Sequence, residues 1–536
     1  MKKIDLFWKL QSILSKEMMN KKGKKTLVVL MSLLFGIVYM LTPFFKPANQ
    51  ENLKIYRLPI GIVFFIVVFL VAGMLIRKGK EHGKELKYSD KKVGIITFCS
   101  IVIMGLLYLM VFYPGTGMYD TLYILSAEDM RLAVQHPWFY CILIQKLVKI
   151  VFAFGGDYET ALVSHSMIQI ILTATVYTYC VLWLKKKKLN RIVLISIMFC
   201  YIMCPIMNLY MITLFKDIPF SLLILLWVPV LYDLWESDGE ILKEKGTLIK
   251  ISLFLCFSLL RNNGIYVSVF IILSILVLYY KKWKTVLFFA CVLLSVIFCN
   301  SAYEKRENIT HLFKETVGIP LQQIAATVYY DGTISEEQKE FIEQVMPIEF
   351  IKEKYYPYSV DNLKWGATKI DNQFLNANKA KFLKVWAELA IPNFKIYVKA
   401  YLANTYGFWS VDNSDYLQRY TTIYVAAYEE WLNENKISIK SIFPSEWQNV
   451  IEKSIITISR GMGAGSLFWI FVMMMLILYA FNDWKILITG MSVMGAWLTL
   501  MISTPVAFQW RYILYIPMTL PLLTGILFLK KVKTEK

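Results

Sequence analysis

The sequence predicts an all-α, polytopic membrane protein with a bundle of about twelve transmembrane helices. The 536 residues are 57% hydrophobic and only 18% charged, and the mean hydropathy is +0.50, which is far too apolar for a soluble chain of this length. Twelve apolar runs approach or exceed the roughly 20 residues that cross a bilayer as a helix. They begin at Thr26, Pro59, Gly94, Ala161, Arg191, Ile218, Thr247, Gly264, Thr285, Leu467, Lys485 and Tyr512.

The net charge of +19 predicts the orientation of the bundle. Nucleic-acid binding is the other meaning of such a charge, but the basic residues flank apolar runs in short segments, where positive charge resists translocation. We therefore predict a protein of the cell membrane, with these segments and both termini on the cytoplasmic side. The basic clusters lie at 2–25, 77–92, 185–188, 281–284 and 530–533.

One further apolar run, 137–154, is long enough to cross, yet counting it would put the cluster at 185–188 on the wrong side. Trp138 and Ile150 fall on an apolar face, whereas Gln145 and Lys149 fall on a polar one. This pattern is typical of an amphipathic helix at the membrane surface. We predict an interfacial helix, the alternative being a true crossing compensated by a missed span.

The chain divides into five parts. The outer part is polar, with helical periodicity at 336–345 and 379–389, and predicts a mostly helical extracytoplasmic domain. The eight cysteines all lie in apolar segments, which indicates packing and not a disulfide framework or metal cluster. The predicted parts are a cytoplasmic N-terminus (1–25), a bundle (26–301) with an outer loop and interfacial helix (114–160), the outer domain (302–466), C-terminal transmembrane helices (467–529) and a cytoplasmic tail (530–536).

Charged side chains at the outer ends of spans are the candidate functional residues, because a charge in hydrocarbon is costly and is retained for function. The motif YPGTGMYD (113–120) follows the third span, and its proline and glycines end the helix and present Asp120 at the membrane surface. His136 then opens the interfacial helix. The structural alternative is a solvated loop aspartate beside a helix-capping turn.

Three other outer hairpins carry charge. In TLFKDIPFS (213–221), Lys216 and Asp217 either form an ordinary surface salt bridge, or Asp217 faces Asp120 while Lys216 meets an anion. In LLRNNGIY (259–266), a turn explains the Asn-Gly step but not Arg261. In FQWRYILYIP (508–517), Arg511 lies at the predicted outer end of a span, although basic residues are favoured on the cytoplasmic side. Its planar guanidinium suits bidentate phosphate binding. Its aromatic neighbours also fit an aromatic belt at the membrane interface. The candidate substrate-binding residues are His136, Lys216, Asp217, Arg261, Asn262, Arg511 and Tyr512, and Asp120 is the candidate catalytic residue.

At these residues the chain resembles the GT-C superfamily of integral-membrane glycosyltransferases, particularly the polyprenyl-phosphate-sugar enzymes related to protein mannosyltransferases. It looks closest to an uncharacterised bacterial branch, and the stretches 319–338 and 355–364 look similar too. The resemblance implies that Asp120 is the acidic residue near the acceptor and that Asp217 matches the acidic position of the next outer loop. The family often has two acids there, whereas Lys216 precedes Asp217 here, which leaves the possible divalent cation open.

The resemblance implies inverting transfer of a sugar from a polyprenyl-phosphate donor to an extracytoplasmic acceptor, namely a wall polymer, glycolipid or protein. The residue chemistry agrees, because a lipid phosphate needs charge neutralisation on departure and an acceptor hydroxyl needs a base. A transporter or flippase of lipid-linked glycans is the alternative, and would show repeats or broken helices. A non-catalytic envelope-binding protein is the third hypothesis and predicts that Asp120 is dispensable. Nucleic acid is not an expected partner.

Overall fold

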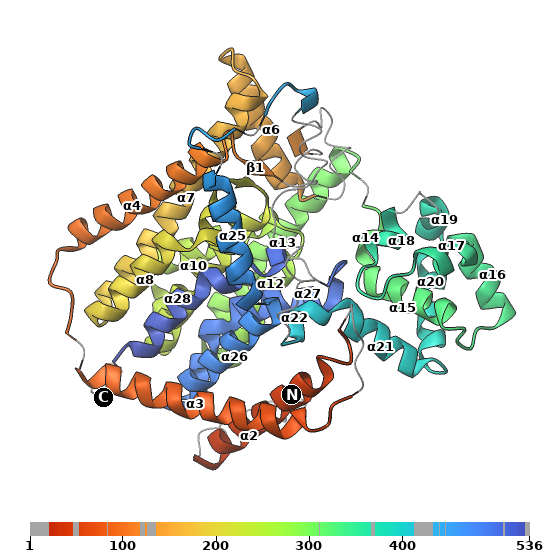
Figure 1. Cartoon of the computed structure of the whole chain (residues 1–536), viewed down its shortest axis with the longest axis horizontal. Helices are drawn as coiled ribbons and strands as arrows, with labels where there is room; N and C mark the ends of the chain where they lie inside the picture. Colours follow the sequence, from red (N-terminus) through yellow and green to blue (C-terminus); the bar gives the residue numbers. More distant parts are fainter. Residues whose placement is uncertain are drawn as a thin grey trace.

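A computed structural model describes residues 21–46, 53–82, 84–117, 124–125, 136–309, 311–365, 370–411, 433–438, 440–444, 446–461, 463–507 and 510–530. These residues form a helical bundle with a smaller helical lobe at its side (Figure 1). The helices of the bundle are α2 (Lys21–Leu41), α3 (Arg57–His82), α4 (Asp90–Val111), α6 (Trp138–Ala153), α7 (Tyr158–Lys186), α8 (Arg191–Met203), α9 (Pro205–Met211), α10 (Asp217–Glu236), α11 (Lys245–Cys256), α12 (Gly264–Leu278), α13 (Trp283–Arg306), α25 (Glu446–Gly461), α26 (Ala464–Phe481), α27 (Met491–Ser503) and α28 (Tyr515–Phe528).

Shorter elements complete the fold. Short 3-10 helices are η2 (Glu240–Lys243), η3 (Phe257–Leu260), η4 (Tyr280–Lys282), η5 (Trp484–Gly490) and η6 (Trp510–Ile513). Two strands, β1 (Thr116–Gly117) and β2 (Thr213–Leu214), form a parallel pair. The lobe and its connection to the bundle contain α14 (Phe313–Thr316), α15 (Gly318–Tyr329), α16 (Glu336–Val345), α17 (Ile348–Lys354), α18 (Asp361–Trp365), α19 (Asn372–Ala377), α20 (Lys379–Ala390), α21 (Phe394–Asn404) and α22 (Tyr406–Trp409).

The chain is an all-α, multi-pass membrane protein by the length and composition of its helices. Within the described residues, nine helices are long and apolar enough to cross a membrane, or ten if α8 and α9, which are bent by 52°, form one span. These correspond to ten of the twelve predicted runs. The other two runs, from Thr247 and Gly264, form α11 with η3 and the 15-residue α12. They are shorter because regular helix stops at the turn around Arg261.

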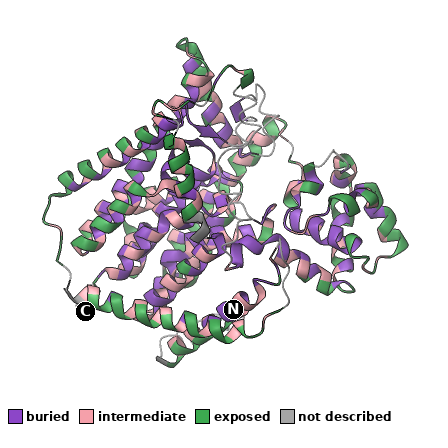
Figure 2. Cartoon of the chain, viewed as in Figure 1, coloured by how far each residue is buried: buried purple, intermediate pink, exposed green. Residues whose placement is uncertain are grey.

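Helix α10 is the centre of the bundle. It is buried along most of its length and contacts α7, α27, α28 and η5. Figure 2 shows the buried interior of the bundle and the exposed outer faces of α3 and α4. On α3 many of the exposed side chains are themselves apolar, among them Val63, Phe64 and Met74. Large apolar side chains on an outer face are expected where the surrounding solvent is lipid.

The lobe has a hydrophobic core of its own, in which Ile351, Leu363 and Leu389 are fully buried. Its helices α16 and α20 coincide with the two stretches whose periodicity predicts helices. A capping box at Ser335 and Gln338 begins α16. The predicted helical character of this region is therefore observed, whereas its position outside the membrane is a prediction.

Backbone hydrogen bonds attach the lobe to the bundle. Val360 N donates to Pro505 O at 2.9 Å and Ala507 N donates to Tyr358 O at 2.9 Å. Farther along the chain, α22 packs on α26, where a Cβ on Gly465 would lie 2.2 Å from the carbonyl oxygen of Ser410. The segment 504–507, just before η6, is thus held by the lobe.

The sidedness of α6 is testable, because Phe154 lies at its exposed end. If α6 is interfacial on the outer side, Phe154→Cys will react with a membrane-impermeant maleimide in intact cells. Lys284→Cys, in a predicted cytoplasmic segment, is the matched control and will react only after permeabilisation. Labelling of the unaltered chain measures the background from its own cysteines. Protection of position 154 until permeabilisation would show that α6 crosses.

Candidate functional site

The two-residue strands bring the first two predicted motifs together. Thr116 pairs with Thr213, and their hydroxyl oxygens are 2.8 Å apart. The preceding Gly115 has a φ of +128°, and a Cβ there would lie 2.5 Å from Ser166 Oγ. A side chain at this position would be both strained and crowded. The glycine therefore allows the YPGTG segment to lie against α7 and beside TLFKD.

A buried amide in α7 holds the second motif in place. Gln169 Nε2 donates to the carbonyl oxygens of Tyr210, Met211 and Thr213 at 3.1, 3.0 and 2.8 Å. These carbonyls lie where α9 ends and β2 begins, so they lack regular helical partners. The sequence analysis did not predict a role for Gln169. The feature that could have indicated one is a polar amide inside an apolar run.

The centre of the site is a buried ion pair. Asp217 Oδ1 lies 2.7 Å from Arg261 Nη1, and the two side chains are 1% and 10% exposed. Asp217 is the first residue of α10, where the helix dipole stabilises a carboxylate. Neither carboxylate oxygen makes a well-directed hydrogen bond with a described residue. The carboxylate is thus charge-compensated but retains capacity to accept hydrogen bonds.

A second arginine lies beside the pair through shared aromatic rings. The Arg511 guanidinium is 4.5 Å from the centre of the Phe215 ring and 4.9 Å from that of Tyr512, and its Nη2 donates to the Tyr512 hydroxyl at 3.2 Å. Arg261 lies 5.3 Å from the same Tyr512 ring. Two cations on one ring are mutually repulsive, and a bound anion would relieve that repulsion.

The remaining predicted cation contacts the predicted histidine. Lys216 Nζ lies 2.6 Å from His136 Nδ1, and His136 is 6% exposed. Because an ammonium only donates, Nδ1 accepts and the neutral ring carries its proton on Nε2. Of the two expectations for Lys216 and Asp217, the mutual salt bridge is not observed, since Asp217 pairs with Arg261.

A tyrosine that sequence reasoning did not single out also belongs here. Tyr140, in α6, is buried, and its hydroxyl has no hydrogen-bond partner among the described residues. Burial raises the pKa of this phenol well above its usual value, and the charge of Asp217 raises it further. Tyr140 is therefore a neutral hydrogen-bond donor close to the carboxylate.

The structure brings together six of the eight predicted residues. His136, Lys216, Asp217, Arg261, Arg511 and Tyr512 converge at the end of the bundle where α10 begins. Asn262 is exposed and lies outside this cluster, while Asn263 donates to Thr499 Oγ1 at 3.3 Å. Asp120 lies outside the described residues, three positions after β1. Within the part of the chain that the structure describes, no three His, Cys, Asp or Glu side chains form a group able to hold a metal ion.

Fold and site define a multi-pass helical membrane protein with a charged, largely buried cluster at one end of its bundle. The chain belongs to a family of unknown function (DUF6020), which it matches over residues 107–535. No curated protein and no solved structure matches it. The matched region starts within α4, so helices α2 and α3 precede it.

The Asp217–Arg261 pair will show strong energetic coupling. Arg261→Met leaves a buried carboxylate without its counter-ion, and we expect it to destabilise the protein by about 3–5 kcal/mol. Adding Asp217→Asn removes that charge and will recover most of the loss. Unfolding of purified protein in detergent measures each corner of the double-mutant cycle.

Arg306→Met is the control, because its pair with Glu307 is exposed and contributes less than about 1 kcal/mol. If the effects of the two single changes at Asp217 and Arg261 simply add, the pair is not coupled.

Proposed function

We propose that this protein is a membrane glycosyltransferase of the GT-C type. It transfers a sugar, with inversion, from a polyprenyl-phosphate donor to a hydroxyl acceptor on the outer side of a cell membrane. The observation that carries the proposal is the cluster at Asp217. Its buried carboxylate has unfilled acceptor capacity and pairs with Arg261, which shares the Tyr512 ring with Arg511, and Lys216 precedes it in the chain. Such an arrangement suits a ligand with both hydroxyl groups and a phosphate.

The arginines suit the leaving group. As the acceptor oxygen bonds to the anomeric carbon, the bond from that carbon to the phosphate oxygen breaks and its electron pair stays on the lipid phosphate. Arg511 and Arg261, held on the Tyr512 ring, would stabilise that charge through planar, bidentate hydrogen bonds. Lys216 adds a third positive charge.

The acceptor requires a base, and Asp120 is the proposed one. In sequence it follows β1 by three residues, and β1 pairs with β2, which precedes Lys216 and Asp217. The base would take the proton of the acceptor hydroxyl as the new bond forms. Asp217, already paired with Arg261, is proposed to accept hydrogen bonds from sugar hydroxyls, and the Tyr140 hydroxyl, unpartnered within the described part of the chain, is proposed to donate one.

The proposed topology has twelve crossings, both termini in the cytoplasm, and the lobe outside. In it, α11 with η3 forms one crossing and α12 another. If α11 and α12 instead form a hairpin that does not cross the membrane, ten crossings remain and the sides of all other segments are unchanged. The lobe would lie outside near the site, because it bonds to the segment 504–507 that leads to Arg511.

A transporter of lipid-linked glycans is the second candidate. The observation in its favour is the 52° bend between α8 and α9, because broken helices often form transporter sites. The two functions differ in chemistry: a transporter moves the lipid-linked sugar intact, whereas a transferase releases polyprenyl phosphate.

Purified protein in nanodiscs, given polyprenyl-phosphate hexoses and candidate acceptors, distinguishes them through release of polyprenyl phosphate. We expect Asp120→Asn to lower turnover by roughly 10²-fold or more, since a general base contributes about 10²–10⁴, with donor affinity unchanged. Unchanged turnover would refute the role of Asp120, and movement of intact donor across the membrane of sealed proteoliposomes, without cleavage, would support the transporter.

Arg511→Ala is expected to weaken binding of undecaprenyl phosphate by about tenfold, the effect of losing one charge-assisted hydrogen bond. Arg511→Lys will recover part of that loss, since it keeps the charge but not the planar geometry. Lys284→Ala, remote in sequence and on the predicted cytoplasmic side, is the control. Equal affinities in all variants would contradict the donor-site assignment.

A further inference from the structure

A cavity of about 650 Å³ lies at the opposite end of the bundle from the site. Helix α10 connects the two, because Asp217 begins it and Asp233 and Glu236, near its other end, line the cavity. A 20-residue helix is about 30 Å long, the thickness of bilayer hydrocarbon. The cavity is therefore at the other membrane surface from the charged cluster, and the proposed function makes no use of it.

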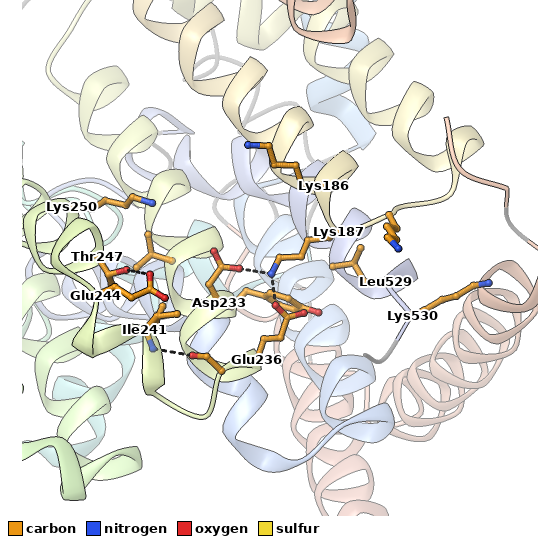
Figure 3. Close-up of a pocket in the computed structure, with 14 residues that line it drawn as sticks. Lys186, Lys187, Asp233, Glu236, Ile241, Glu244, Thr247, Lys250, Leu529 and Lys530 are labelled. Atoms are coloured by element: carbon orange, nitrogen blue, oxygen red, sulfur yellow. Dashed lines mark hydrogen bonds and ion pairs between the residues drawn. The ribbon is translucent and has the colours of Figure 1, made fainter. Parts of the chain in front are cut away.

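The wall of the cavity contains a fixed ion-pair group. Lys187 Nζ lies 2.7 Å from Asp233 Oδ1 and also pairs with Glu236. Trp183 Nε1 donates to the same Asp233 carboxylate at 3.1 and 3.2 Å. Figure 3 shows Lys187 pointing between the two acids. Its charge is thus compensated and its position set by the fold.

Four more lysines line the cavity from three separate segments. Lys186 and Lys188 lie at the end of α7, Lys250 lies on α11, and Lys530 follows α28. Figure 3 shows Lys250 and Lys530 at opposite sides of the pocket. None of these four lysines forms an ion pair with a residue that the structure describes. Asp233 and Glu236 pair with Lys187, and the third acidic residue of the lining, Glu244, accepts a 3.5 Å hydrogen bond from Thr247.

The cavity is positively charged as a whole. Five lysines and three acids line it, which leaves two surplus positive charges. Helices α7, α10 and α28 end beside it and α11 begins there, and each helix end carries a partial charge of about half a unit, negative at C-termini and positive at N-termini. These partial charges offset about one of the two surplus charges, so a net positive charge remains.

We infer that this cavity binds a phosphate-bearing head group. Lysines brought to one cavity from different segments suit a compact, multiply charged anion. Apolar residues, including Val230, Ile241 and Leu529, line the same cavity and suit the glycerol and first acyl carbons of a lipid. A soluble phosphate ester would engage the same lysines. The inference is therefore that the ligand carries a phosphate, and the experiment distinguishes a lipid from a soluble phosphate ester.

The test uses the full chain purified in detergent and follows its thermal unfolding midpoint, which a ligand of the folded state raises. Dioctanoyl phosphatidic acid and dioctanoylglycerol differ only in the phosphate, and glycerol 3-phosphate has the phosphate without the acyl chains. We expect phosphatidic acid, glycerol 3-phosphate or both to raise the midpoint, and dioctanoylglycerol not to do so. A response to phosphatidic acid alone identifies a lipid, and a response to glycerol phosphate alone identifies a soluble ligand.

The pocket variant is Lys188→Gln with Lys250→Gln, and the matched control is Lys281→Gln with Lys284→Gln, which removes the same charge at the same predicted membrane face. We expect the Kd for the effective ligand to rise at least tenfold in the pocket variant and less than twofold in the control. The four lysines changed in these two variants project from outer surfaces or from the cavity wall. The unfolding midpoint without ligand should therefore stay unchanged in both variants. Equal losses in both variants, or equal stabilisation by dioctanoylglycerol, would overturn the inference.

Discussion

The buried ion pair between Asp217 and Arg261 is the constraint on which the charged end of the bundle depends. Removing two charges from water costs several kcal/mol each, and only close approach with further polar contacts offsets that cost. The fold provides these conditions by beginning α10 at Asp217 and by turning the chain at Arg261, between η3 and α12. The interruption that makes α11 and α12 short is the same feature that brings the arginine to the carboxylate.

The surrounding elements restrict how that pair can move. Gln169 fixes the backbone before Lys216 through three carbonyl contacts, and the lobe fixes the backbone before Arg511 through Pro505 and Ala507. Lys216 and Arg511 are thus each attached to a segment with its own support. A ligand entering here would meet charges already oriented, which reduces the ordering cost of binding.

Hydropathy and charge were sufficient to predict the membrane class and most helices, because the cost of burying polar backbone in lipid leaves long apolar runs. They predicted six residues of the cluster because charges at span ends are expensive. They did not predict the partners. Lys216 and Asp217 are adjacent in sequence, but successive side chains at a helix start point in different directions, so one meets His136 and the other Arg261.

Other features were beyond sequence reasoning for physical reasons. The pairing of β1 with β2 joins residues 97 positions apart, and two-residue strands carry no periodicity. Gln169 has no charge to mark it, and its importance depends on carbonyls that only the fold brings near. Helices α11 and α12 are about as apolar as several of the longer candidate spans, so composition alone did not predict that they would be short. Asp120 stays a prediction, since it lies outside the described residues.

The two helices that precede the family region have a structural role of their own. Helices α2 and α3 pack closely on each other and on α26. Beyond α2, the carbonyls of Thr42 and Phe45 accept hydrogen bonds from the hydroxyls of Tyr406 and Tyr358, at 3.0 and 2.7 Å. Tyr358 also accepts the backbone bond from Ala507. The added hairpin therefore supports the junction between lobe and bundle, and through the segment 504–507 it reinforces the position of Arg511 without contributing a charge to the cluster.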